Sequence, residues 1–253
     1  MARKTLRVAD IETSELLYYD KVHEESCYQF CEKRDIDYLP SVDDPSKFYQ
    51  REDSVRGFVK TDMLSEHCVD GNLNIFHPDL LKAFERSPLL FVFTHKELTG
   101  IAHYSDYGRK PVSLYLYDLL FEYERDLREL LDAKGITNQQ MCDFFQQTGQ
   151  KRKTRDCRKN LAKMSRLPPF QSFYLIDLIG LLEHHEIMNL DIDVNKLRNQ
   201  IMHAHELVDQ IDYHADDYRY NFDSFKTFFN RVQSLLGDMK RVKSRIQFET
   251  GIE

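Results

Sequence analysis

The chain has 253 residues, of which 42% are hydrophobic and 30% charged, and its formal net charge at pH 7 is −7. This composition is typical of a globular protein with one or two domains and excludes a disordered chain. No apolar run approaches the roughly 20 residues that span a bilayer. The N-terminus also lacks an uninterrupted apolar segment of signal-peptide type, so we expect a cytoplasmic protein without a membrane partner.

The first part of the chain, up to Pro111, alternates segments of strand character with segments of helix character. Runs rich in β-branched and aromatic residues, bounded by Gly, Pro or Asp, predict strands over 35–42, 54–62, 89–95 and 98–106. Apolar residues at helical spacing predict helices over 24–34 and 77–87, and Pro78 suits the first turn of the second one. The pattern indicates a mixed α+β module over residues 1–111.

From Val112 onward, every long segment has the apolar spacing of a helix. We expect helices over 113–134, 137–147, 154–164, 170–188, 192–211 and 221–246. Thr137 and Asp223 are suitable N-caps, whereas Gly135 and the Pro168-Pro169 pair interrupt the chain between helices. The sequence therefore predicts an all-α helical bundle over residues 112–253.

Residues 76–106 end in Gly100, Ile101 and Asp106, with His103 three positions before the aspartate. This segment resembles the second half of a CBS repeat, which closes with the signature G-I-x-[ST]-x-x-D. Here His103 replaces the usual Ser or Thr. A more degenerate copy ends at Asp62, and the two copies together resemble a tandem CBS pair over about residues 5–111.

The CBS resemblance implies an adenine-nucleotide effector bound between the two repeats. In that family the signature Asp accepts hydrogen bonds from ribose hydroxyls, and the Ser/Thr contacts phosphate. The resemblance thus assigns Asp106 to the ribose and His103 to the phosphate side, with Asp62 as a further ligand-binding candidate. The alternative is that Asp106 caps the following turn and that the repeats only dimerise the protein.

The helix expected over 192–211 carries an unusual set of polar residues. At about 100° per residue, one apolar stripe contains Val194, Leu197, Ile201, Ala204, Val208 and Ile211. Asn199, His203 and Glu206 project from the opposite side, and Arg198 lies on the flank. A solvent-facing side normally carries Lys and Glu, so these residues indicate a functional site. His205 lies at the edge of the stripe, where a packed role is favoured.

The preceding helix is apolar on nearly every side between Phe173 and Leu182, and only Asp177 and Gly180 interrupt it. Such a helix must be buried on more than one side. The bundle covers one side, and a second subunit would cover the other. We therefore expect a homodimer whose interface brings the two 198–203 segments together.

Arg198-Asn199-x-x-x-His203 in a late helix of an all-α domain resembles the R-x4-6-H motif of the HEPN superfamily. The resemblance covers about residues 113–250 and implies a metal-independent RNA endonuclease that acts as a dimer and requires no cofactor. Histidine, with an ordinary pKa of about 6.5, suits His203 as general acid or base. Arg198 would stabilise the charge on the phosphorane, and Asn199 would orient the phosphate or the imidazole.

Residues 150–163 hold seven Lys or Arg against one Asp in an otherwise acidic chain. Such a cluster is typical of a surface that contacts the phosphates of RNA, here through Lys151, Arg152, Lys153, Arg155, Arg158 and Lys159. The alternative is a solvated helix face. Segment 209–222 is expected to be a loop, either free or with side chains that stack on bases, namely Tyr213, His214, Tyr218 and Tyr220.

The sequence predicts no metal site. His184 and His185 are adjacent, so on a helix they point about 100° apart and do not easily share one ion. None of the five cysteines forms a C-x-x-C pair. Cys27 and Cys31 lie four residues apart in a predicted helix, which favours a packed thiol pair over a metal or disulfide site.

Together these patterns predict a nucleotide-responsive ribonuclease: the CBS-like pair senses a ligand and the HEPN-like dimer cuts RNA. Such a combination suits a toxin, as a stress or anti-phage effector. The alternative is a non-catalytic signalling or RNA-binding homodimer, in which Arg198 and His203 only form polar contacts across the dimer interface.

Overall fold

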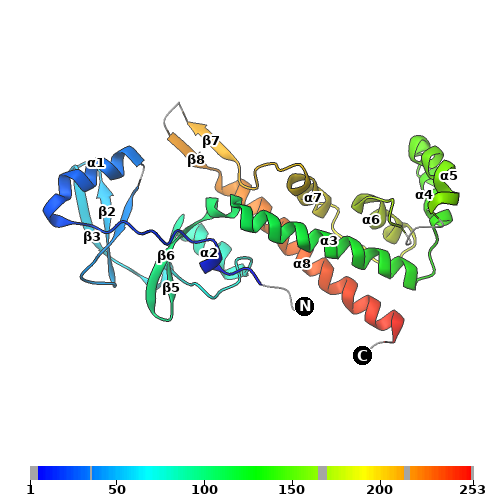
Figure 1. The fold of residues 1–253 in the computed structure, drawn as a ribbon, viewed down its shortest axis with the longest axis horizontal. Coiled ribbons are helices and arrows are strands. Elements are labelled where there is room, and N and C mark those ends of the chain that lie inside the picture. The colour runs from blue at the N-terminus through cyan, green and yellow to red at the C-terminus, as the bar shows by residue number, and fades with distance from the viewer. Residues whose placement is uncertain (1–4, 35, 165–169, 214–216, 252–253) are drawn as a thin grey trace. The chain divides into compact units, whose positions relative to one another are not determined.

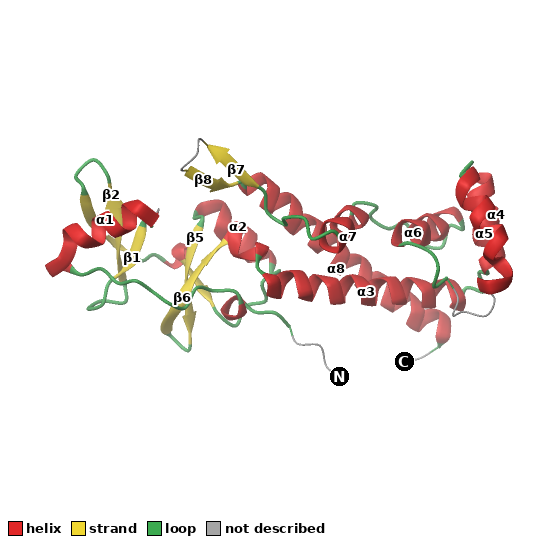
Figure 2. Cartoon of the chain, turned by 45° about the horizontal axis from the view of Figure 1, so that its top comes forward, coloured by secondary structure: helices red, strands yellow, loops and turns green. Residues whose placement is uncertain are grey.

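The computed structural model describes residues 5–34, 36–164, 170–213 and 217–251. It has the mixed α+β composition that the sequence predicts, with small sheets in the N-terminal part and a helical C-terminal part (Figures 1 and 2). The chain divides into two compact units. The first contains residues 1–112 and 210–225, and the second contains residues 113–209 and 226–253.

In the first unit, α1 (Glu24–Arg34) precedes an antiparallel sheet of β1 (Tyr38–Pro40), β2 (Lys47–Glu52) and β3 (Gly57–Asp62), in that order. The helix has the predicted bounds, but β2 was not predicted from the sequence. The charged residues Lys47, Arg51 and Glu52 occur on both faces of this strand and conceal its alternation, whereas Phe48 is buried. Pairing with β1 and β3 makes the segment a strand.

The second sheet combines β4 (Cys68–Asp70), β5 (Leu89–Thr94) and β6 (Glu97–His103). β4 and β5 pair in parallel through the connecting helix α2 (Pro78–Arg86), and β5 and β6 form an antiparallel hairpin. Leu90, Phe91 and Val92 are buried in this sheet. The predicted order of helix, strand, turn and strand over residues 76–106 is confirmed.

The second part of the chain contains six helices within the described residues: α3 (Lys110–Ala133), α4 (Asn138–Gln147), α5 (Lys151–Met164), α6 (Leu175–His184), α7 (Val194–Met202) and α8 (Phe222–Thr250). The Thr137 side chain accepts a hydrogen bond from the Gln140 N–H, so the predicted N-cap is confirmed. The predicted cap at Asp223 is wrong, because the Asn221 side chain accepts from the Ser224 N–H instead.

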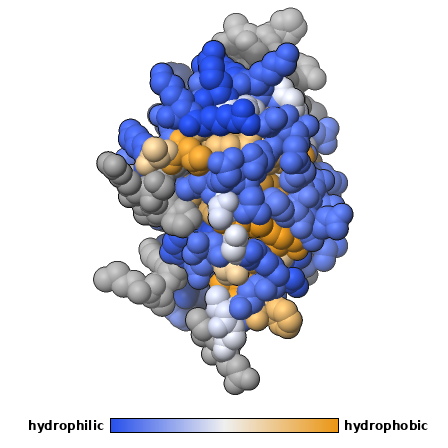
Figure 3. Space-filling model, turned by 90° about the vertical axis from the view of Figure 1, so that its right-hand side faces the viewer, coloured by the Kyte–Doolittle hydropathy of each residue, from blue (hydrophilic) through white to orange (hydrophobic). Residues whose placement is uncertain are grey.

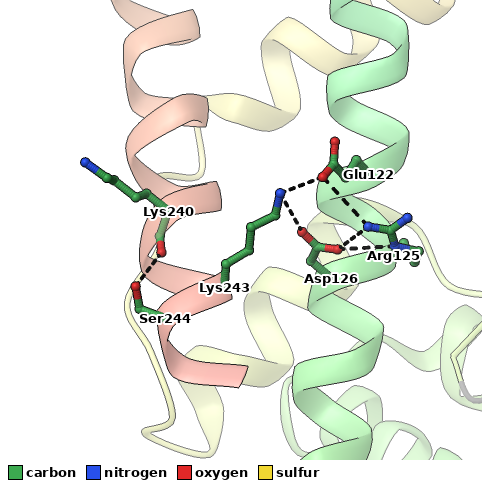
Figure 4. A network of polar contacts seen from close by, with 6 residues as sticks. All are labelled: Glu122, Arg125, Asp126, Lys240, Lys243 and Ser244. Carbon is green, nitrogen blue, oxygen red and sulfur yellow. Dashed lines mark hydrogen bonds and ion pairs between the residues drawn. The ribbon is translucent and has the colours of Figure 1, made fainter. Parts of the chain in front are cut away.

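Helices α3 and α8 run side by side in the second unit, and charged residues join them (Figure 4). Lys243 Nζ of α8 lies 2.5 Å from Glu122 Oε1 and 3.9 Å from Asp126 Oδ2 of α3. Nearer the ends of the two helices, Lys134 Nζ lies 2.6 Å from Glu249 Oε1. Both helices also bury apolar side chains that form the core of the unit, among them Leu120, Leu127, Leu131, Val232, Leu235 and Val242.

Helix α7 ends at Met202, nine residues before the predicted end at position 211. Ala204 adopts a left-handed conformation with a φ of 51°. Its N–H donates to the Ile201 carbonyl, and the His205 N–H donates to the Gln200 carbonyl at 2.9 Å. This pair of bonds is a Schellman motif, which usually uses Gly at the left-handed position. Because Ala gives no such signal, the sequence did not reveal the end of the helix.

A hairpin stands where the sequence predicted a loop. β7 (Gln210–Tyr213) pairs antiparallel with β8 (Asp217–Tyr220), and both strands belong to the first unit. His214, one of the predicted base-stacking residues, lies outside the described residues. In the described part of the chain, no helix is both long and apolar enough to cross a membrane.

Candidate functional site

The motif residues lie on the last turns of α7. Val194 and Leu197 are buried, whereas Asn199 and His203 are exposed. The predicted faces of this helix are therefore confirmed as far as Met202. His203 is the C-cap residue, and its backbone N–H donates to the Asn199 carbonyl at 3.1 Å. The last turn thus presents Asn199 and His203 to solvent one above the other.

Arg198 is held on the flank of α7 by a carboxylate of α3. Its Nε lies 3.6 Å from Glu124 Oε1, and both atoms are shielded from solvent. Its Nη1 lies 3.5 Å from Asn199 Oδ1. Glu124 therefore anchors the inner edge of the guanidinium and leaves a terminal nitrogen beside Asn199. Glu124 was not predicted as a site residue, because nothing in the sequence links a residue of α3 to α7.

Two further arginines fix the surroundings of the motif. Arg128 Nη2 donates to Glu124 Oε2 at 2.9 Å, and its Nε donates to the Phe170 carbonyl at 3.2 Å. On the other flank of α7, Arg231 Nη1 of α8 donates to Gln200 Oε1 at 3.1 Å. These contacts hold α7 in place through both of its neighbours.

Within the described residues, no hydrogen bond or ion pair joins Arg198 to His203. At about 100° per residue, positions five apart on a helix point about 140° away from each other. His205 lies beyond the turn at Ala204 and is exposed, so its predicted packed role is wrong. The early end of α7 explains this difference: the imidazoles of His203 and His205 lie with ring centroids 6.0 Å apart.

The predicted RNA-binding residues lie on α5, on a largely hydrophilic face of the molecule (Figure 3). Five of them are exposed, namely Lys151, Arg152, Arg155, Arg158 and Lys159. Lys153 differs from the others, because its Nζ lies 2.6 Å from Oδ1 of the buried Asp177. Arg158 is hydrogen-bonded to Gln146 of α4. The basic surface thus includes five exposed residues, whereas Lys153 is half-exposed and paired with a buried carboxylate.

A disulfide joins Cys142 of α4 to Cys157 of α5, with the Cα atoms 5.6 Å apart. Both residues are buried on the faces where the two helices meet. This bond was not predicted from the sequence, since only the packing of the two helices brings the cysteines together. Cys27 and Cys31 are free thiols, as predicted, and burial raises the pKa of the Cys31 thiol above its usual value.

His103 and Asp106 form a reciprocal cap on the turn Tyr104–Gly108. The His103 N–H donates to Asp106 Oδ2 at 2.7 Å, and His103 Nδ1 accepts from the Ser105 N–H at 3.1 Å. Asp106 Oδ1 lies 2.7 Å from Arg109 Nη2. Both carboxylate oxygens of Asp106 are therefore engaged within the chain. This geometry matches the alternative in which Asp106 caps the turn.

Asp62, the equivalent residue of the first repeat, has a different environment. It ends β3, where it is exposed and paired with Lys47 of the neighbouring strand. Among the described residues, no hydrogen bond or ion pair joins Asp62 to His103 or Asp106. Asp62 therefore lies at the end of one sheet, whereas His103 and Asp106 lie at the end of the other sheet and in the turn that follows it.

Acid is expected to destabilise the first unit through His103. Burial lowers the pKa of His103 from 6.5 to about 4, so the unfolded chain takes up this proton at a higher pH than the folded chain. The free energy of unfolding therefore has its full value above pH 6.5. It decreases as the pH falls from 6.5 through 4, by up to about 3 kcal/mol. Burial raises the pKa of Asp106, which opposes this loss at the acid end of the range.

Urea unfolding measured between pH 7.5 and 5 tests this prediction. His103→Asn retains an acceptor for the Ser105 N–H but does not titrate, so its unfolding free energy should vary less with pH than that of the wild type. Equal pH dependence in both proteins would contradict the assignment to His103.

The apolar helix α6 is covered within a single chain. Its buried apolar residues are at most 2% exposed, namely Leu175, Leu178, Ile179, Leu181 and Leu182. Gly180 allows close packing, since a Cβ there would lie 3.0 Å from the Phe144 ring. The expectation that a second subunit covers this helix is therefore wrong. Exposed apolar side chains occur instead on α3, at Leu114, Tyr117 and Phe121.

Within the described residues, no group of three or more His, Cys, Asp or Glu is arranged to hold a metal ion. Comparison of the chain with protein-family models, with curated proteins and with solved structures finds no match. Function is consequently inferred from the chemistry of the α7 motif, its anchor on α3 and the basic surface of α5.

Proposed function

We propose that this protein is a metal-independent RNA endonuclease of HEPN type that uses Arg198, Asn199 and His203. One observation carries the proposal: Asn199 and His203 are exposed on the last turn of α7, while Glu124 holds Arg198 beside Asn199. An imidazole, an amide and a fixed guanidinium together supply proton transfer, orientation and positive charge.

These groups suit cleavage by the neighbouring 2′-hydroxyl. The 2′-oxygen loses its proton to a base and forms a bond to phosphorus, and the bond from phosphorus to the 5′-oxygen breaks. The leaving oxygen takes a proton from an acid. Arg198 stabilises the negative charge that develops on the non-bridging oxygens. The products are a 2′,3′-cyclic phosphate and a 5′-hydroxyl.

Cleavage of a labelled single-stranded RNA in EDTA tests the activity. Fragments that carry a 2′,3′-cyclic phosphate and a 5′-hydroxyl are expected. A 5′-phosphate product, or no cleavage under any condition in which the RNA binds, would overturn the proposal. The second of these outcomes would favour the alternative function, a non-catalytic RNA-binding protein.

The basic surface of α5 is expected to bind the RNA backbone. Changing Lys151, Arg152, Arg155 and Lys159 together to Gln should weaken RNA binding, because fewer counterions are released. The slope of log K against log salt should become shallower by roughly 0.7 for each phosphate that the variant no longer neutralises. Fluorescence anisotropy over a range of salt concentrations measures both quantities.

A matched control removes the same charge from the first unit by changing four exposed residues to Gln, namely Lys21, Lys33, Lys82 and Lys110. We expect RNA affinity and salt slope to stay close to the wild-type values. Equal losses in the two variants would show that only total charge matters, and α5 would then have no special role.

Dimerisation and nucleotide regulation are separate parts of the proposal. A dimer would use a surface other than α6, and α3 offers Leu114, Tyr117 and Phe121. Sedimentation at micromolar concentration measures the assembly state.

Calorimetry with ATP, ADP, AMP and S-adenosylmethionine tests nucleotide binding by the first unit, with Asp106→Ala as the variant. No binding by the wild type to any of these nucleotides would exclude the sensor function.

A further inference from the structure

The Schellman turn after α7 places two exposed imidazoles close together. His203 is the C-cap residue and His205 follows the left-handed Ala204. The His205 N–H is fixed by the Gln200 carbonyl at 2.9 Å, and the two ring centroids lie 6.0 Å apart at an interplanar angle of 53°. The backbone bonds of the turn therefore hold the two histidine Cα atoms close together.

The cleavage reaction needs two separate proton-transfer groups. In an in-line displacement, the attacking and leaving oxygens lie on opposite sides of phosphorus, and each must come within about 2.6–3.2 Å of its own acid or base. A single imidazole does not reach both oxygens at once. Two neighbouring imidazoles, whose ring centroids lie 6.0 Å apart, supply two such groups.

The two histidines follow Arg198 and Asn199 at the end of α7. Arg198 Nη1 lies 3.5 Å from Asn199 Oδ1, and Asn199 lies one turn before His203. The charged groups around these residues are Arg198 and Glu124 on one flank, Arg231 on the other, and the neighbouring Glu206. The guanidinium, the amide and both imidazoles thus belong to one chain.

We infer that His205 is a second catalytic residue, which forms an acid–base pair with His203 in the same chain. This inference rests on the proposed RNA cleavage. One imidazole, initially neutral, accepts the proton of the 2′-hydroxyl as that oxygen bonds to phosphorus. The other, initially protonated, donates its proton to the 5′-oxygen as the phosphorus–oxygen bond breaks. The step balances without a further reactant, and the pair returns to its starting state when the two histidines exchange protonation with water.

An acid–base pair of His203 and His205 predicts how the cleavage rate depends on pH. Activity needs one neutral and one protonated imidazole, so kcat/KM of the wild type should follow a bell-shaped curve. Replacing either histidine by Asn should remove one limb of the bell and lower the rate by about 10²-fold or more. A merely structural role of His205 would lower the rate without changing the shape of the curve.

The decisive experiment compares His203→Asn and His205→Asn on two RNA substrates in EDTA. One substrate has the normal 5′-oxygen at the scissile bond, and the other has sulfur there. A thiolate leaves without protonation, so the variant that lacks the general acid should recover most of its rate on the sulfur substrate. The variant that lacks the general base should remain slow. Recovery by either variant supports the pair and assigns the two roles.

The control is His95→Asn, which removes an exposed histidine from the turn between β5 and β6. Its φ of 53° suits Asn, and its rate should equal that of the wild type. If the wild type and His205→Asn cleave equally fast, or if sulfur rescues neither variant, His205 is not catalytic, while cleavage that depends on His203 would stand. If the wild type does not cleave, the proposed function itself fails.

Discussion

Replacing His203 with Ala is expected to lower the rate of RNA cleavage by about 10²-fold or more, with RNA affinity nearly unchanged. The imidazole is exposed at the end of α7, so its removal leaves no cavity and should not affect folding. Single-turnover cleavage measures the rate, and anisotropy at the same salt concentration measures the affinity. Cleavage by His203→Ala as fast as by the wild type would show that the histidine has no catalytic role.

Variants of Arg198, and of Glu124 that holds it, test whether the positive charge of the guanidinium contributes to cleavage. Arg198→Lys keeps the charge but loses the planar fork, so the cleavage rate should again fall severely. Glu124→Gln should also slow cleavage, because it weakens the contact that fixes the guanidinium. If Glu124 acts by positioning, its removal should lower kcat more than it raises KM.

Lys196→Gln is the matched control for the charge variants, since Lys196 is an exposed cation on α7 that pairs with Asp193. Its cleavage rate should match that of the wild type. A loss equal to that of Arg198→Lys would mean that any cation on α7 serves, and the role assigned to the guanidinium fork would then be wrong.

Reduction of the Cys142–Cys157 disulfide is expected to lower the free energy of unfolding of the second unit by about 3 kcal/mol. The bond closes a loop with a sequence separation of 15 and thereby restricts the unfolded chain. Urea unfolding with and without a phosphine reductant measures the difference. The double variant Cys142→Ala, Cys157→Ala should be less stable than the oxidised wild type and insensitive to the reductant.

A thiol count in the denatured, unreduced protein checks the bond directly. Three reactive thiols are expected, from Cys27, Cys31 and Cys68, and five would contradict the disulfide. Cys68→Ala is the control, because it removes a free thiol and should keep the sensitivity to reductant. Disulfides are rare in the cytoplasm, so the same count on freshly isolated protein also bears on the predicted location.

Local signals in the sequence determined most of the helices. The apolar spacing of α1 gave both of its ends, and Thr137 and Gly135 marked the turn between α3 and α4. The same spacing placed Asn199 and His203 on the exposed face of α7. These features depend on residues within one or two turns of each other, where propensity and capping act.

The tertiary structure alone decided which distant residues meet. Glu124 reaches Arg198 from α3, and Cys142 meets Cys157 because α4 and α5 pack together. Helix α7 also ends early, at Met202, before the left-handed Ala204, whose residue type does not favour such a turn, and His205 therefore lies exposed beside His203. Such contacts depend on the free energy of the whole folded unit, and no local sequence pattern predicts them.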